Sequence, residues 1–219
     1  MVQPESYDLI CDCYYLQRDL IPSLQAGVRP GGVLIVIAHL AGPAGNRDAS
    51  ERLRGYRDAI RSLSGRRSRE LEMAGDFRED AGYQAGRRLL ASKNPPTAVF
   101  AANDAMAIGL LASFQESGVR VPQDVAVAGF DDIPIARFAT PPLSTVQVPI
   151  AELGARATRL LLQALAGSGR RARRHETLPT TLVVRDSCGA SLREDSRSEG
   201  RDFPLKRKIT LPTERRHSP

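Results

Sequence analysis

The sequence predicts an α/β fold in which a parallel sheet is flanked by helices on both of its faces. Short apolar runs alternate with longer stretches of helical periodicity. Each connection is long enough for the crossover that parallel strands require. Polar residues also follow the ends of the runs, at the edge where open α/β sheets bind ligands. The four runs cover residues 33–38, 69–74, 97–102 and 125–130.

The third and fourth runs show the repeating unit most clearly. Between them lies a helical pattern with Met106, Leu110 and Phe114 on one face, at i, i+4 and i+8. Gly118 is placed to close this helix as its C′ residue. A helix of this length connects two strands that point the same way, so their carboxyl ends meet at one edge of the sheet.

Two further helices are predicted before this unit, over residues 48–63 and 76–92. Each opens with a D-x-x-E pair, a pattern typical of a helix N-terminus, in which Asp48 and Asp76 would act as caps. Four strands that alternate with three helices require a parallel sheet covered on both faces.

The pattern changes after Asp132. A strand is predicted over 143–148, a helix over 150–165, a loop over 167–174 and a strand over 178–184. Because this helix is apolar on most of its faces, we expect it to be buried. Residues 189–219 are rich in Ser, Arg and Glu, with few apolar residues, and we expect them to be disordered.

The net charge of +6 suggests a nucleic-acid partner, but its location argues against one. Four arginines lie within 170–174, and the tail from Gly189 holds 8 basic and 5 acidic residues. The remaining body has 19 basic and 20 acidic residues and is close to neutral. We therefore interpret the basic segments as solvated, and expect no specific DNA binding by this chain itself.

Three cysteines, Cys11, Cys13 and Cys188, provide neither a disulfide framework nor a four-ligand zinc site. The N-terminus lacks a secretory signal pattern, and the apolar run over 33–38 is too short to span a membrane. We expect a cytoplasmic protein with no membrane partner.

No catalytic pattern stands out. His39, His175 and His217 are isolated and lack metal-ligand spacing. The sequence has no G-x-S-x-G, no G-x-x-x-x-G-K-[ST] and no G-x-G-x-x-G motif. We expect no enzyme, no cofactor, no metal and no catalytic residue.

Polar and aromatic residues near four strand ends form the candidate ligand site: Arg52, Phe77, Asn103 and Asp131. Carboxylate, amide and guanidinium groups suit the hydroxyls of a polyol, and an aromatic face packs on the apolar side of a sugar ring.

Each residue of this site also has a purely structural interpretation. Asn103 and Asp131 could act only as helix caps, as Asn and Asp residues after strands commonly do. Arg52 could be a surface arginine, and Phe77 could belong to the core. Asp104 is expected to be a helix cap or a structural partner rather than a ligand contact, and Asp76 and Asp132 are expected to be structural as well.

Five collinear motifs resemble the effector-binding module of the LacI/GalR family of transcription regulators, between about residues 40 and 188. They read GPAGNRDASERLRGY, GDFREDAGYQAGRRLL, PPTAVFAANDAMAIG, VAVAGFDDIPIA and ATPPLSTVQVPIAELG. The resemblance implies a periplasmic-binding-protein-like fold of type I that senses a small molecule, expected to be a sugar. It also places Arg52, Asn103 and Asp131 at effector-contacting positions and Phe77 at a ring-stacking position.

The family pattern is incomplete in this chain. The resemblance implies two lobes and a preceding helix-turn-helix, whereas we expect this sequence to encode one lobe in full, a truncated second lobe and no helix-turn-helix. DNA would be bound only through that missing domain, and homodimerisation stays open. We expect weak effector affinity, because one wall of the cleft is missing, and a tendency to associate.

The first 38 residues resemble something else. The stretch YDLICDCYYLQRDLIPSLQAGVRPGGVLIVI, residues 7–37, is similar to the late part of a class I S-adenosylmethionine methyltransferase, without its Gly-rich loop. The expected organisation is a methyltransferase-like fragment over 1–38, a sensor domain over 39–188 and a disordered tail over 189–219. The alternatives to a sensor are a methyltransferase fragment and a non-functional chimera.

Overall fold

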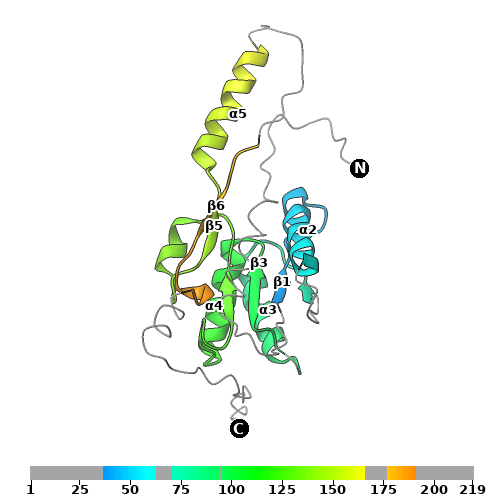
Figure 1. The fold of residues 1–219 in the computed structure, drawn as a ribbon, viewed down its shortest axis with the longest axis vertical. Helices are drawn as coiled ribbons and strands as arrows, with labels where there is room; N and C mark the ends of the chain where they lie inside the picture. Colours follow the sequence, from blue (N-terminus) through cyan, green and yellow to red (C-terminus); the bar gives the residue numbers. More distant parts are fainter. Residues whose placement is uncertain (1–36, 63–70, 94, 166–176, 191–219) are drawn as a thin grey trace, which may run out of the picture.

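A computed structural model describes residues 37–62, 71–93, 95–165 and 177–190 of the chain (Figure 1). Several predictions therefore lie outside the described residues. They concern the segment before residue 37, with Cys11 and Cys13, the loop over 167–174 and nearly all of the tail.

A four-stranded parallel sheet forms the centre of the fold, as predicted. Its strands lie in the order β2-β1-β3-β4. They are β1 (Ile37–Leu40), β2 (Leu71–Met73), β3 (Ala98–Ala101) and β4 (Ala126–Ala128). Strand β1 pairs with β3 so that His39 lies opposite Phe100, and β3 pairs with β4 so that Phe100 lies opposite Ala128. Both inner strands, β1 and β3, are buried along their whole length.

Two later strands extend the sheet beyond β4. Strands β5 (Thr145–Gln147) and β6 (Thr181–Val183) form an antiparallel pair. Single parallel bridges connect the β4 side to β5, joining Ala128 to Ser144 and Asp131 to Gln147. The carboxyl end of β5 therefore reaches the same edge of the sheet as the ends of the first four strands.

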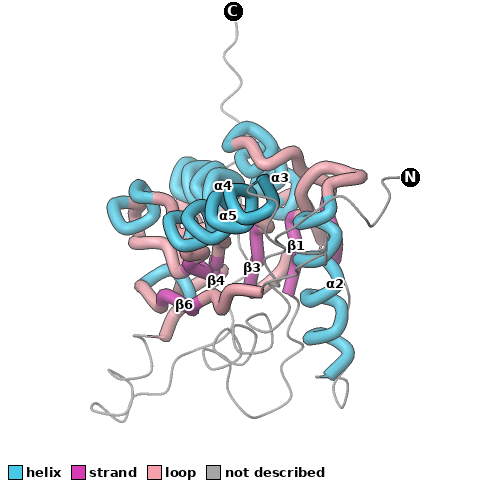
Figure 2. Tube along the Cα trace, turned by 90° about the horizontal axis from the view of Figure 1, so that it is seen from above, coloured by secondary structure: helices cyan, strands magenta, loops and turns pink. Residues whose placement is uncertain are grey.

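Helices cover both faces of the sheet. Helix α2 (Arg47–Ser62) lies on one face, and α3 (Glu79–Leu90) and α4 (Asp104–Glu116) lie on the other (Figure 2). Side chains alternate between the two faces along each strand. Ala38, Leu40 and Val99 accordingly pack in the core under α3 and α4, whereas Ile37 and Phe100 pack under α2.

Helices α3 and α4 pack with their backbones in close approach. A Cβ atom at Gly82 would overlap the carbonyl oxygen of Met106, and one at Gly109 would overlap that of Glu79. Phe114 of α4 is fully buried beside this contact. Gly118 follows α4 with a φ of +68°, which confirms it as the left-handed C′ residue.

The predicted caps of the first two helices were wrong. Helix α2 is capped by Asn46, whose Oδ1 accepts from the backbone N–H of Ala49 at 2.9 Å, so Asp48 lies inside the first turn. Helix α3 begins after Arg78, which makes no side-chain cap. Asp76 instead accepts from the backbone N–H of Arg78 at 2.9 Å, and Arg78 is the residue just before the helix. In both segments the capping pattern lies close to the helix start, but the predicted aspartate is not the cap.

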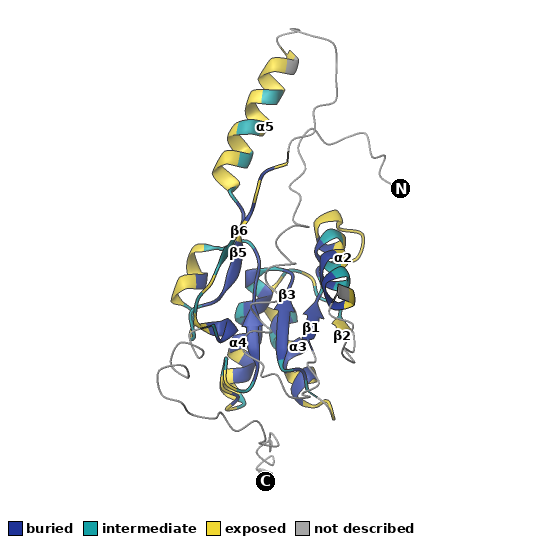
Figure 3. Ribbon diagram, in the orientation of Figure 1, coloured by how far each residue is buried: buried dark blue, intermediate teal, exposed yellow. Residues whose placement is uncertain are grey.

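Helix α5 (Ile150–Leu165) differs most from expectation. Its existence is confirmed, but its predicted burial is wrong, because Leu161, Leu162 and Leu165 are 56%, 60% and 75% exposed. The helix starts just after β5 and projects away from the sheet, and Figure 3 shows it exposed along most of its length. No described helix is long and apolar enough to cross a membrane.

His39 is a fully buried ionisable group under α2. Its ring stacks on Tyr56 of α2 and on Phe100 of β3, with centroids 5.1 Å away in each case. Nδ1 lies 3.0 Å from the carbonyl oxygen of Phe100 and donates to it, since a carbonyl can only accept. Nε2 is buried without a hydrogen-bond partner in the described structure. Burial therefore lowers the pKa of His39 to about 4.

Candidate functional site

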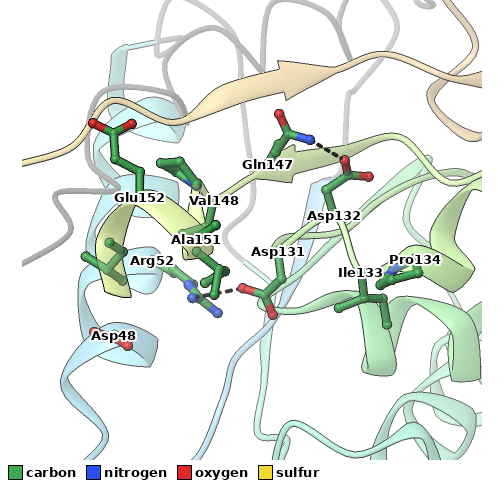
Figure 4. Close-up of a pocket in the computed structure, with 13 residues that line it drawn as sticks. Asp48, Arg52, Asp131, Asp132, Ile133, Pro134, Gln147, Val148, Ala151 and Glu152 are labelled. Atoms are coloured by element: carbon green, nitrogen blue, oxygen red, sulfur yellow. Dashed lines mark hydrogen bonds and ion pairs between the residues drawn. The ribbon is translucent and has the colours of Figure 1, made fainter. Parts of the chain in front are cut away.

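A cavity of about 880 Å³ opens at the carboxyl edge of the sheet. Asp48 and Arg52 reach it from α2, the turn over 131–134 follows β4, and the end of β5 with the first turn of α5 forms the remaining wall (Figure 4). Its size lies within the usual range for small-molecule sites. A cavity therefore lies at the edge of the sheet where the strand ends predicted a ligand site.

Arg52 is the centre of the candidate site. Its Nη1 donates to the carbonyl oxygen of Ala102 at 2.6 Å, and its Nη2 lies 3.3 Å from Oδ1 of Asp131. The guanidinium carbon lies 3.9 Å from the ring centroid of Phe130 and 5.7 Å from that of Phe77. Only 10% of the side chain is exposed, so the surface interpretation of Arg52 is wrong.

Asp131 faces Arg52 across the cavity floor. Its side chain is 31% exposed, so a carboxylate oxygen remains open to the cavity. Burial raises the pKa of Asp131, although the charge of Arg52 opposes this shift and that of Asp48 adds to it. The backbone of Asp131 has a φ of +112°, which is rare for a residue with a side chain.

Asp132 also lines the cavity, but its oxygens already have partners. Oδ1 accepts from Nη2 of Arg185 at 2.7 Å, and Oδ2 accepts from the side-chain amide of Gln147 at 2.8 Å. Arg185 also donates to the carbonyl oxygen of Leu143 at 2.7 Å. Asp132 thereby ties the turn to β5 and to the segment after β6, in agreement with its predicted structural role.

Asn103 and Phe77 lie next to this group rather than in the cavity lining. Oδ1 of Asn103 accepts from the backbone N–H of Met106 at 3.0 Å and caps α4. Its Nδ2 donates to the carbonyl oxygen of Phe77 at 2.9 Å. Phe77 has a φ of +70°, and its ring packs on Gly42, where a Cβ atom would overlap it. Of the four predicted residues, Arg52 and Asp131 meet at the cavity, Phe77 lies beside Arg52, and Asn103 holds Phe77.

The sequence prediction missed the contributions of β5 and α5. Gln147, Val148 and the first turn of α5 line the cavity. The predicted site draws only on the ends of the first four strands. It would have included Gln147 and Val148 if the strand over 143–148 had been treated as a fifth parallel neighbour.

Within the described residues, no group of three or more His, Cys, Asp or Glu side chains could hold a metal ion. The polar side chains that line the cavity carry carboxylates, one guanidinium and one amide. These groups can donate and accept hydrogen bonds to a bound molecule.

Comparison with known proteins identifies the family. The profile of the family "Periplasmic binding protein-like domain" matches residues 34–188. The chain is 42% identical over 126 residues to the ribose operon repressor of Escherichia coli K12, which covers 58% of this chain and 38% of the relative. It is 46% identical over 109 residues to the lactose operon repressor of Rhizobium radiobacter, covering 50% of this chain and 95% of the relative.

Solved structures of regulators share the fold. The transcriptional regulator CelR in complex with cellobiose aligns with a TM-score of 0.72 and 36% identity, over 82% of this chain and 53% of that one. The Lac repressor bound to ONPG aligns with a TM-score of 0.71 and 30% identity, over 82% and 52%.

The matched region is only part of most relatives. The chain spans 36% of the repressor MelR of Bacillus subtilis, with 42% identity over 125 residues, and about half of the two solved regulators. The family profile begins at residue 34, so the methyltransferase resemblance of the preceding stretch stays a prediction. The chain belongs to the family of periplasmic binding protein-like domains, and its described part corresponds to the effector-binding domain of LacI-type transcriptional repressors.

Proposed function

We propose that the domain over residues 34–188 senses a neutral polyol, most simply a sugar, which binds in the cavity beside Arg52 and Asp131. The observation that carries the proposal is the buried guanidinium of Arg52 opposite a partly open carboxylate, at the carboxyl edge of a parallel sheet. Sugar hydroxyls can donate to Asp131 and accept from Arg52.

The charge of the cavity favours a neutral ligand over an anionic one. Four carboxylates line it, from Asp48, Asp131, Asp132 and Glu152, against the single guanidinium of Arg52. Arg185 and Arg156 pair with two of these carboxylates from outside the lining, which reduces the excess of negative charge without reversing it. A phosphate or carboxylate on the effector would meet this negative field at short range.

The names of similar proteins support the same class of ligand. Two are named for ribose and lactose operons, and one structure is a complex with cellobiose. A Lac repressor structure is a dimer bound to operator. By analogy, we propose that effector binding here controls DNA binding by a part outside residues 34–188, that the regulator acts as a homodimer, and that it does so in the cytoplasm without catalysis.

Asp131→Ala should weaken binding of the effector by about ten- to a hundredfold. The reason is that a charge-assisted hydrogen bond contributes about 1.5–3 kcal/mol, and Asp131 is the lining carboxylate whose Oδ1 lies within hydrogen-bond distance of Arg52. Isothermal titration calorimetry with ribose, lactose, cellobiose and ONPG provides the measurement. Ribose 5-phosphate should bind more weakly than ribose.

Asp58→Ala is the matched control, because it removes an aspartate from a surface ion pair with Arg61 on the same helix as Arg52. It should leave affinity unchanged. An Asp131→Ala variant with wild-type affinity would remove Asp131 from the site, and no binding of any probe by the wild-type chain would count against a sugar effector.

A further inference from the structure

Asp104 is a fully buried carboxylate that does not line the cavity beside Arg52. It is the first residue of α4, and its backbone N–H donates to the carbonyl oxygen of Phe130 at 2.8 Å. Its Oδ2 accepts from the backbone N–H of Ile133 at 2.9 Å, and its Oδ1 accepts from the hydroxyl of Thr145 at 2.5 Å. A single residue of α4 therefore holds the turn between β4 and the short helix η1 (Pro134–Phe138) just before and just after its two aspartates.

The turn held in this way has an unfavourable backbone conformation. Asp131 has a φ of +112° and Asp132 a φ of +56°. Such conformations are unfavourable for residues with a side chain and persist only where the surroundings fix them. On the other side, the backbone N–H of Asp131 donates to Val146 of β5 at 2.8 Å. Hydrogen bonds from α4 and from β5 thus fix the turn together.

The space around the Asp104 carboxylate is filled. A Cβ atom at Gly129 would overlap its Oδ1 and would approach Leu143 and Ala107. The carboxylate therefore cannot move toward β4. Because its position is fixed, the hydrogen bond that it accepts from Ile133 also fixes the position of the Ile133 backbone.

We propose that Asp104 is a positioning residue for the effector site, which places the Asp131 carboxylate opposite Arg52 by holding the turn between Phe130 and Ile133. This inference rests on the proposed function, because it assigns Asp131 the role of an effector contact. Asp104 itself touches no effector and acts only through the turn.

The charges around Asp104 fit this role. From the turn, Asp131 and Asp132 face it, and these two carboxylates are paired with Arg52 and Arg185. Burial raises the pKa of Asp104 to about 6, while the hydrogen bonds from Thr145 and Ile133 oppose the shift. At neutral pH the group is ionised, so the bond from the Ile133 N–H is charge-assisted when the site is in use.

The test compares three variants of the full chain. Asp104→Ala removes the hold and should weaken binding of ribose, lactose, cellobiose or ONPG by about tenfold. Asp104→Asn keeps an oxygen for the Ile133 N–H and can donate to Thr145, so affinity should return to within about threefold of wild type. Leu110→Ala creates a cavity at a fully buried position of the same helix and should leave affinity within about twofold.

Equal losses of affinity in Asp104→Ala and Leu110→Ala would overturn the proposal, because the effect would then be one of general destabilisation. Wild-type affinity in Asp104→Ala, or no recovery in Asp104→Asn, would do the same. If Asp104→Ala does not fold, Thr145→Val takes its place, since it removes only the hydroxyl that orients the carboxylate. A loss of about threefold is expected there, and unchanged affinity overturns the proposal.

A readout without ligand separates this proposal from the proposed function. Amide hydrogen exchange at Ile133 should accelerate in Asp104→Ala, but not in Asp104→Asn or Leu110→Ala under native conditions. If the wild-type chain binds none of the probes, the sugar-sensing function fails while this exchange pattern still tests the hold. Unchanged exchange in Asp104→Ala would show that Asp104 does not hold the turn.

Discussion

Phe114→Ala should lower the free energy of unfolding by about 3–5 kcal/mol. Phe114 of α4 is fully buried in the core on the α3 and α4 face of the sheet, and its ring lies close to Gly86 of α3. The backbones of α3 and α4 already touch at Gly82 and Gly109, so the helices cannot move closer to fill the space left by the ring. Urea denaturation followed by far-ultraviolet circular dichroism measures the loss.

Phe138→Ala provides the control with the same chemical change. Phe138 lies in the short helix η1 (Pro134–Phe138) and is 72% exposed. Its replacement should change the free energy of unfolding by less than about 0.5 kcal/mol. Comparable losses in the two variants would mean that the core on the α3 and α4 face is not as closely packed as the structure shows.

Two buried groups should give the stability of the protein opposite dependences on pH. The pKa of His39 is lowered from 6.5 to about 4, so between these values the unfolded chain takes up a proton that the folded chain does not. At about 1.4 kcal/mol for each pKa unit, about 3 kcal/mol of stability is present above pH 6.5 and is lost as the pH falls to 4.

Asp104 has the reverse effect. Its pKa is raised from 3.8 to about 6, so the folded chain holds a proton that the unfolded chain has released. This contribution, again about 3 kcal/mol, is present below pH 3.8 and is lost as the pH rises through 6. Between pH 4 and 6 the two effects nearly offset each other in the wild-type protein.

Single substitutions should reveal each effect. Relative to wild type, His39→Leu should lose about 3 kcal/mol of stability as the pH rises from 4 to 6.5, because only the Asp104 dependence remains. Relative to wild type, Asp104→Asn should gain about 3 kcal/mol of stability over the same pH range, because only the His39 dependence remains. Urea denaturation at half-unit steps of pH measures both differences. Asp58→Asn, at a surface ion pair, should give a curve parallel to wild type.

Curves for His39→Leu and Asp104→Asn that both run parallel to wild type would contradict the prediction. They would mean that water reaches the two groups in the folded state, so that neither pKa departs from its ordinary value. If only one variant gave a curve parallel to wild type, only the group replaced in that variant would have an ordinary pKa in the folded state.

Helix periodicity and the parallel direction of the strands were predictable from the sequence because they depend on local patterns. Helix α4 was predicted from the spacing of Met106, Leu110 and Phe114, and all three are fully buried. The parallel direction of the strands followed from the alternation of strands and helices along the chain. The meeting of Arg52 with Asp131 followed from the shared edge of the strands.

The parts that failed depend on what each segment packs against. The apolar face of α5 predicted burial, but within the described residues that face is largely uncovered, because the helix leaves the sheet after its first turn. The double hydrogen bonding of Asn103, to Met106 and Phe77, could not be predicted either, since Phe77 lies far away in sequence. Sequence patterns fix the periodicity of a segment but not the surface it contacts.

The ends of the sheet also determine how copies of this chain can associate. Among the described strands, the two edges are β2 and β6, and each is only three residues long. Such short edges present few unpaired backbone groups to a strand from another molecule. Growth of the sheet from one copy into the next is therefore disfavoured, and concentrated samples should keep the amide I infrared spectrum of the dilute protein.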